Sequence, residues 1–132
     1  MDLKFRKLCE MNGIDFLADT NAILYYLTGN KCMEPFVSCK FAFSVISEME
    51  LLSFANITEQ EEQSIRSFLK KCQLLSLTNE VKNKTILLRR KYNIKLPDAI
   101  IAATAIENGL ELITADIGFR KISELKLKLI TP

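Results

Sequence analysis

Three acidic residues stand at places in the sequence where carboxylates could act together. Asp19 directly follows the apolar run "IDFLA", and Asp116 comes one alanine after the run "LELIT". Asp98 is the second residue of "PDAIIAATAIEN", a segment of helical composition. Carboxylates that gather at one place repel one another unless a positive charge lies between them. If these three acids meet, the chemistry that they suit is the binding of a cation.

The composition narrows the choice of cation. The chain has no histidine, and its four cysteines, Cys9, Cys32, Cys39 and Cys72, form no Cys-x-x-Cys pair, which argues against a zinc site. The matching ion is a hard one with oxygen ligands, Mg²⁺ or Mn²⁺. Such an ion can activate water and neutralise charge on a phosphate, so the pattern favours metal-assisted hydrolysis of a phosphodiester.

Helix capping is the simpler explanation for each acid taken alone. Asp19, Thr20 and Asn21 are all good N-cap residues for a helix that begins at this point. Asp98 would lie in the first turn of its helix, where the helix dipole favours a carboxylate. The coincidence of three acids at one side of a predicted sheet is what favours the cation site over capping.

The segment "SVISEMELL" offers a fourth acid, either Glu48 or Glu50. Two residues apart on a predicted helix, these side chains point to roughly opposite sides and cannot both face one site. Spacing alone does not choose between them.

Length and charge predict one compact domain, residues 1–132. Of the 132 residues, 48% are hydrophobic and 26% charged, which suits a single core. The net charge of +2 neither demands nor excludes a nucleic-acid partner. We see no secretory signal and no run long enough to span a membrane, so we expect a cytoplasmic protein with reduced thiols.

Strand-length apolar runs alternate with longer segments of helical spacing. This alternation predicts a parallel sheet with helices on both faces, and the strands are expected at residues 14–18, 41–45, 74–77, 110–114 and 127–130. In such a sheet a ligand site lies beyond the carboxyl ends of the strands, close to where the strand order reverses. The acids that follow the strands are therefore expected at the site.

Two helices carry clear boundary signals. Thr58 and Glu61 form a capping box, which predicts a helix over residues 59–71. Pro97 suits a first helical position and Gly109 a left-handed stop, which predicts a helix over 97–108. Further helices are expected after Asn21, over 47–54, over 79–92 and within residues 1–12, a possible N-terminal extension.

Four segments carry a family resemblance when they are taken together and in order. "FLADTNAILYYL", "SVISEMELL", "KLPDAIIAATAI" and "LITADIGFRKI" resemble the motifs of the PIN-domain ribonucleases, most closely the VapC-type toxins of bacterial toxin–antitoxin pairs. The similarity extends from about Asn12 to Pro132. It implies a three-layer α/β/α sandwich around a central, mostly parallel five-stranded sheet.

The resemblance assigns roles residue by residue. It implies that the catalytic, metal-holding acids are Asp19, Glu50, Asp98 and Asp116, and it favours Glu50 over Glu48. The implied supporting residues are Asn21, Ser44 and Thr114. Two departures from the family pattern are the segment "MDLKFRKLCE" before Met11 and Gly118, where many relatives have a further acid.

The implied activity is that of a Mg²⁺- or Mn²⁺-dependent endoribonuclease acting on structured RNA such as tRNA or rRNA. A cognate antitoxin and a homodimer are the implied protein partners, and no membrane is involved. Basic residues that could touch RNA phosphates are Arg89, Arg90, Lys91, Arg120 and Lys121, although a solvated helix face and a charged turn explain them more simply.

A non-catalytic PIN-fold module that binds RNA or protein is the alternative from another class. Metal titration separates the two, because such a module has no reason to hold a divalent ion tightly. A phosphatase or a receiver domain with a phosphorylated aspartate is disfavoured. Both would place a second acid near Asp19, and the phosphatase needs it at the position of Asn21.

Overall fold

The fold is built around a parallel sheet with the strand order β3-β2-β1-β4-β5, seen in a computed structural model that describes residues 13–132. The strands are β1 (Phe16–Ala18), β2 (Phe41–Ser44), β3 (Gln73–Leu75), β4 (Glu111–Thr114) and β5 (Leu127–Leu129). All four neighbouring pairs are parallel, which confirms the predicted sheet. Each predicted strand is present but shorter, and β3 begins one residue before the expected start.

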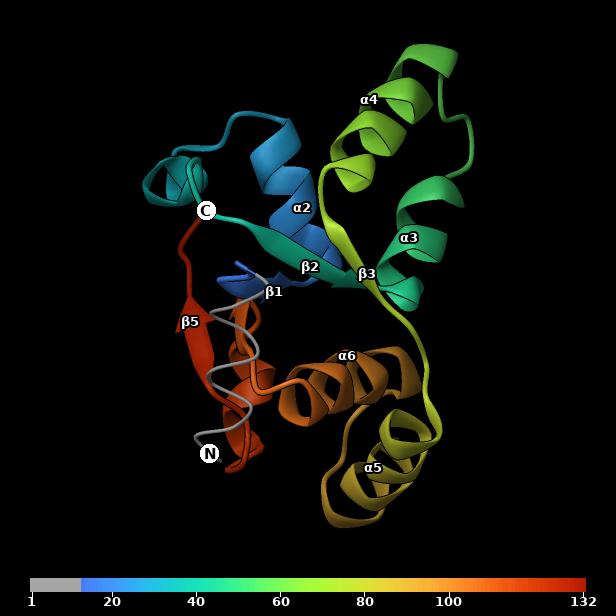
Figure 1. Cartoon of the computed structure of the whole chain (residues 1–132), viewed down its shortest axis with the longest axis vertical. Helices are drawn as coiled ribbons and strands as arrows, with labels where there is room; N and C mark the ends of the chain where they lie inside the picture. The colour runs from blue at the N-terminus through green and yellow to red at the C-terminus, as the bar shows by residue number, and fades with distance from the viewer. Residues whose placement is uncertain (1–12) are drawn as a thin grey trace.

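Helices cover both faces of this sheet (Figure 1). On one face lie α2 (Thr20–Leu27), α3 (Val45–Leu52) and α4 (Glu59–Lys70), and on the other lie α5 (Asn79–Lys91) and α6 (Leu96–Glu107). Two 3₁₀ helices, η1 (Lys31–Phe36) and η2 (Ile117–Lys121), complete the described part. The three-layer α/β/α sandwich is therefore confirmed.

Alternation along the strands explains the two layers of core. Leu17 and Leu112 point to one face and pack with α5 and α6, whereas Ala18, Phe43 and Ile113 pack with α2, α3 and α4. Side chains of a strand alternate between faces, so a strand covered on both sides is apolar throughout.

No helix between residues 13 and 132 is long and apolar enough to cross a bilayer.

The capping signals were largely correct. The Thr58–Glu61 capping box is present, and Gly109 adopts a left-handed φ of 63°. Pro97 lies at the second helical position rather than the first, because α6 begins at Leu96.

Two helices begin earlier than predicted because a side chain at the strand end caps them. Ser44 Oγ accepts from the Ile46 N–H at 3.1 Å, so α3 begins at Val45 and not at residue 47. Asp19 caps α2 in the same way, so that helix begins at Thr20 rather than after Asn21. The sequence analysis missed η1, and the helix expected within residues 1–12 lies outside the described residues.

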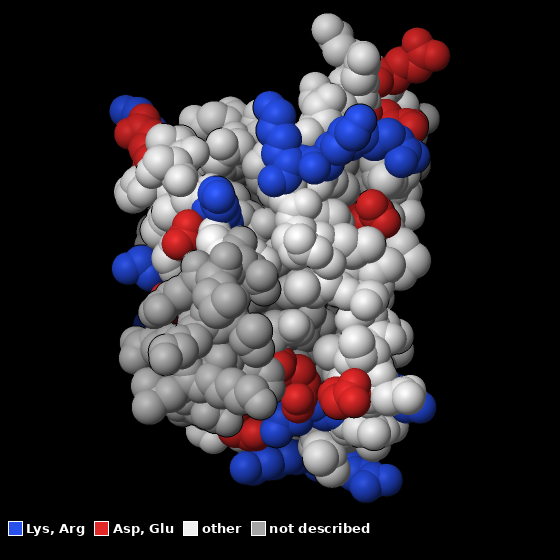
Figure 2. All heavy atoms as spheres, viewed as in Figure 1, with Lys and Arg blue, Asp and Glu red and all other residues white. Residues whose placement is uncertain are grey.

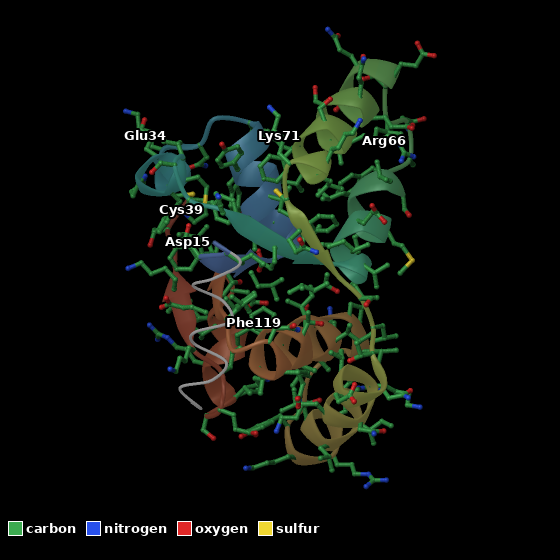
Figure 3. All side chains as sticks on the ribbon, viewed as in Figure 1. Asp15, Glu34, Cys39, Arg66, Lys71 and Phe119 are labelled. Carbon is green, nitrogen blue, oxygen red and sulfur yellow. The ribbon has the colours of Figure 1, made fainter. Side chains whose placement is uncertain are left out.

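The strand order reverses at β1. The chain proceeds from β1 to β2 and β3 on one side and then places β4 and β5 on the other side of β1. Connections after β1 and β4 leave the sheet in opposite directions, which opens a crevice at the carboxyl ends of these two strands. Asp15 and Cys39, labelled in Figure 3, lie at the opposite, amino ends of β1 and β2.

Candidate active site

Asp19 is a buried carboxylate at the carboxyl end of the central strand. It is 6% exposed, its Oδ1 accepts from the Ala22 N–H at 2.8 Å, and its Oδ2 accepts from the Thr114 hydroxyl. The first bond confirms the helix-capping explanation. Each oxygen of an ionised carboxylate has a second lone pair, so both remain able to bind a further partner. Capping and ligand binding are therefore compatible at this residue.

Thr114 joins Asp19 to Asp116. It ends β4, is fully buried, and lies beside Asp19 because Ala18 and Ile113 are paired in register. Its oxygen also accepts from the Asp116 N–H at 3.0 Å, and Asp116 Oδ1 in turn accepts from the Gly118 N–H at 2.8 Å. Thr114 thus holds the backbone at Asp116 close to the carboxylate of Asp19.

Glu50 reaches the site from α3. Thr20 Oγ1, at the start of α2, lies 2.6 Å from Glu50 Oε1 and 3.0 Å from Ser47 Oγ. Ser47 and Glu50 are three residues apart and so share one face of α3. The structure thereby brings Glu50, rather than Glu48, next to the turn that carries Asp19.

Asp98, in the first turn of α6, completes the group of acids. Its pKa is raised first by burial and then by the negative charges of Asp116 and Glu50, while Lys95 acts in the opposite direction. The pKa of Asp19 is also raised, chiefly by burial and less by Asp116 and Asp98, against the opposing bonds from Thr114 and Ala22. All four acids are therefore linked electrostatically at one end of the sheet.

The carboxylate oxygens of these acids are suitable ligands for a hard divalent ion, although the acids do not surround a common centre. Among the described residues, no three Asp, Glu or Cys side chains lie close enough to form a ready-made metal group. The like charges that raise the pKa values of Asp19 and Asp98 are nevertheless those that a cation would relieve. The four acids therefore form an open group whose carboxylate oxygens are of the kind that a hard cation prefers.

The predicted supporting residues differ in how directly they contact the four acids. Thr114 contacts Asp19 directly, and Ser44 is buried and caps α3. Asn21 is exposed on α2, whereas its neighbour Thr20 makes the contact with Glu50. Thr20 was predicted only as a helix-capping residue, and its contact with Glu50 and the role of Ser47 were not predicted. The three-residue spacing from Ser47 to Glu50 was nevertheless a signal that these two share a helix face.

The basic residues predicted to touch RNA occupy the ends of α5 and η2. Lys121 Nζ donates to the Asn93 carbonyl at 2.7 Å, and Arg89 Nε donates to the Ile94 carbonyl at 3.3 Å. Lys91 Nζ lies 5.3 Å from the centre of the Tyr92 ring, and the side chains of Arg90 and Arg120 are exposed. In the region of α5 and α6, acidic and basic side chains lie close together on the surface (Figure 2). Of the five, Lys121 lies in a pocket with Asp98 and Asp116.

Comparison with known proteins decides the family. The sequence pattern of the PIN domain matches residues 16–125. The chain belongs to the PIN-domain family. The predicted resemblance, to PIN domains and to their VapC members, is confirmed. A comparison with curated protein sequences gave no significant match.

Solved structures similar to this chain include proteins of bacterial toxin–antitoxin systems. A toxin–antitoxin complex from Klebsiella pneumoniae is 30% identical with a TM-score of 0.73, and the match covers 84% of this chain and 95% of that one. VapBC2 from Rickettsia felis, bound to a DNA fragment from its promoter, is 22% identical with a TM-score of 0.76, covering 89% and 100%. VapBC-1 from nontypeable Haemophilus influenzae is 23% identical with a TM-score of 0.69, covering 88% and 98%.

Proposed function

We propose that this PIN domain is a metal-dependent endoribonuclease and the toxin of a toxin–antitoxin pair. The observation that carries the proposal is the link from Asp19 through Thr114 to Asp116, with Asp98 and Glu50 in the same electrostatic field. Asp19 is buried and Asp98 is partly buried, and carboxylates held in this way near other negative charges destabilise a fold. Their presence at a ligand crevice therefore favours a functional role. Membership of the PIN family, whose VapC members are nucleases, supports the same conclusion.

In this proposal Asp19, Glu50, Asp98 and Asp116 would hold Mg²⁺ or Mn²⁺. The bound ion would supply an activated water and neutralise charge on the phosphate that is attacked. The chain's own contribution is orientation: Thr114 fixes Asp19 and the turn of Asp116, and Thr20 fixes Glu50. Carboxylates held by neighbouring hydroxyls lose less freedom on binding an ion than mobile ones do.

The partners follow from the relatives and remain proposals for this chain. The Klebsiella pneumoniae relative is part of a toxin–antitoxin complex, and we infer an antitoxin that silences this PIN domain. We also propose structured RNA, such as tRNA or rRNA, as the substrate, a homodimer as the active form, and a single domain over residues 1–132. The cytoplasmic location stays a prediction.

One observation favours the alternative, a non-catalytic module that binds RNA or protein. The acids in the described part of the chain do not form a ready-made metal group. A module of this kind would show no tight binding of a divalent ion, and the two functions therefore differ in a directly measurable property.

The test is cleavage of total cellular RNA by the purified full chain with Mg²⁺, Mn²⁺ or EDTA. Asp19→Asn is the inactive variant, and Asp15→Asn is its matched control, since Asp15 is exposed at the other end of β1. Mn²⁺ binding is measured by calorimetry on the same samples. Metal-dependent cleavage lost only in Asp19→Asn supports the nuclease. Absence of cleavage together with absence of Mn²⁺ binding in the wild type would favour the non-catalytic module.

A further inference from the structure

Two lysines lie in a pocket with two of the proposed metal-holding acids. Asp98, Asp116, Lys95 and Lys121 line this pocket, whose volume is about 220 Å³. The buried ring of Phe119 contributes to the lining and is labelled in Figure 3. Lys95 was not singled out from the sequence, and the proposed metal chemistry uses neither lysine.

Neither lysine lies within ion-pair distance of a carboxylate in the described part of the chain. In residues 13–132 the ion pairs within 4.0 Å are Arg66–Glu62 and Lys84–Glu124, and neither includes Lys95 or Lys121. The Lys121 ammonium instead donates to the Asn93 carbonyl, which uses one of its three N–H groups. Two positive charges therefore face the pocket without an ion-pair partner.

Lys95 lies where the helix dipole disfavours an ammonium group, and the charge that attracts it there is that of Asp98 in the first turn of α6. Lys95 is the N-cap of α6, and its side chain makes no capping bond. Lysine has no acceptor with which to cap a helix, and the positive end of the helix dipole repels an ammonium group. Backbone N–H groups and a lysine at one helix start together provide donors for an anion.

The wall that carries Lys95 is held in place by three contacts. Lys121 donates to Asn93, Arg89 donates to Ile94, and the Tyr92 hydroxyl lies 3.2 Å from Ser123 Oγ. The connection between α5 and α6 is thus tied to α5 and to the segment around η2. A wall fixed in advance lowers the entropic cost of binding a ligand.

The charges in the pocket indicate what the ligand is. Without a metal, Asp98 and Asp116 offset Lys95 and Lys121. A divalent cation on the acids would leave the pocket with excess positive charge, and an anion would then be attracted. For a nuclease the anion that meets a metal is a phosphodiester of the substrate.

We propose that Lys95 and Lys121 form a subsite for an RNA phosphate beside the metal-holding acids, so that metal and RNA bind the pocket cooperatively. This inference rests on the proposed function and names where its substrate is held. It selects Lys121 from the five predicted basic residues and adds Lys95. Arg89 becomes a positioning residue for the pocket wall.

The test is binding of a short, mixed-sequence, fluorescein-labelled single-stranded RNA to the full chain, measured by anisotropy. Ca²⁺, which also takes oxygen ligands, is compared with EDTA over a series of salt concentrations. The variants are Lys95→Gln, Lys121→Gln and the charge-conserving Lys121→Arg. Lys31→Gln is the matched control, because Lys31 is exposed on η1, which precedes the amino end of β2. Melting temperatures check that each variant is folded.

We expect tighter binding by the wild type with Ca²⁺ than with EDTA. Each glutamine variant should lower the slope of log K against log salt by about 0.7 and lose much of the gain from Ca²⁺. Lys121→Arg and Lys31→Gln should resemble the wild type. Wild-type slopes in both glutamine variants, or no RNA binding by the wild type with Ca²⁺, would overturn the subsite. Failure of the nuclease proposal shows separately, as absence of metal-dependent RNA cleavage together with absence of Mn²⁺ binding in the wild type.

Discussion

The hydroxyl of Thr114 donates to the Asp19 carboxylate and accepts from the backbone N–H of Asp116. These acids are 97 positions apart in the chain (116 − 19), and the pairing of β1 with β4 brings them to one threonine. The acids after the two central strands therefore do not move independently.

Thr114→Val should destabilise the protein and disturb the site. Valine keeps the shape but leaves a buried Asp19 oxygen and the Asp116 N–H without this partner, at a cost of about 1–3 kcal/mol. The pKa of Asp19 should rise further, because the Thr114 bond lowers it in the wild type. Urea unfolding measures the first effect and NMR titration of the Asp19 carboxyl the second. Thr114→Ser, which keeps the hydroxyl, is the control; if serine and valine behave alike, the bond does not matter.

Asp98→Asn should leave the metal-free protein at least as stable as the wild type at pH 7. Because the pKa of Asp98 is raised in the folded state, the stabilising form is the protonated one. As the pH falls through the folded-state pKa of Asp98 toward the ordinary value of 3.8, this carboxyl becomes protonated and neutral. The free energy of unfolding of the wild type should then rise relative to that of Asp98→Asn, whose side chain is neutral at every pH. Urea unfolding at several pH values checks this, and a gap that widens toward acid would contradict it.

Addition of Mn²⁺ at pH 7 should make the wild type more stable than Asp98→Asn. An ion that binds only the folded state stabilises it by about 2.7 kcal/mol at a hundred times its Kd. The wild type should therefore gain stability with Mn²⁺, and Asp98→Asn should gain less. Equal gains in both proteins would mean that Asp98 does not hold the ion.

Glu50→Gln should reduce RNA cleavage severely, on the order of 100-fold as for loss of an electrostatic catalytic group, and Glu48→Gln should have little effect. The two substitutions are chemically identical and lie on one helix, so each controls for the other. Only Glu50 contacts Thr20 and acts on Asp98. The reverse result would show that the second motif had been assigned to the wrong glutamate.

Most of the elements, and the places of Asp19 and Asp116, were predictable because their signals are local, whereas the choice of Glu50 over Glu48 came from the family resemblance. The Thr58–Glu61 capping box and the left-handed Gly109 each depend on a few neighbouring residues. Asp19 and Asp116 could be placed because both follow apolar strands, and parallel strands bring their carboxyl ends to one edge. The starts of α2 and α3 were misplaced because the polar residue at the strand end both ends the strand and caps the helix.

The contacts that organise the site could not be read from local pattern. Thr20 and Glu50 are 30 positions apart in the chain. They are in contact only because α2 and α3 pack on the same face of the sheet. In the sequence nothing distinguishes Lys95 from other charged residues between helices. It lies in a pocket with Lys121 only because the start of α6 lies beside η2 in the fold. Such contacts depend on packing, which spacing within one segment does not encode.

Thr20→Val should lower metal affinity and cleavage without unfolding the protein. The Thr20 hydroxyl lies 2.6 Å from Glu50, and its loss should let that exposed carboxylate move freely. Thr20→Ser should restore both properties. In the double variant with Glu50→Gln the two losses should not add, because residues in contact are coupled. Calorimetry with Mn²⁺ and a cleavage assay are applied to the wild type, the three single variants and the double variant. Fully additive losses would show that Thr20 acts independently of Glu50.

Gly118→Ala should impair the site although it adds only a methyl group. A Cβ at Gly118 would lie 3.0 Å from Asp116 Oδ1, closer than ordinary contact, and it would displace the carboxylate that the Gly118 N–H now holds at 2.8 Å. We expect weaker Mn²⁺ binding and slower cleavage, with Gly29→Ala as the control, since a Cβ at Gly29 meets nothing within 4 Å. Gly29 has a positive φ of 72°, so its variant should lose stability but keep Mn²⁺ affinity. If Gly118→Ala binds Mn²⁺ as tightly as the wild type, the position of the Asp116 carboxylate is not critical for the ion.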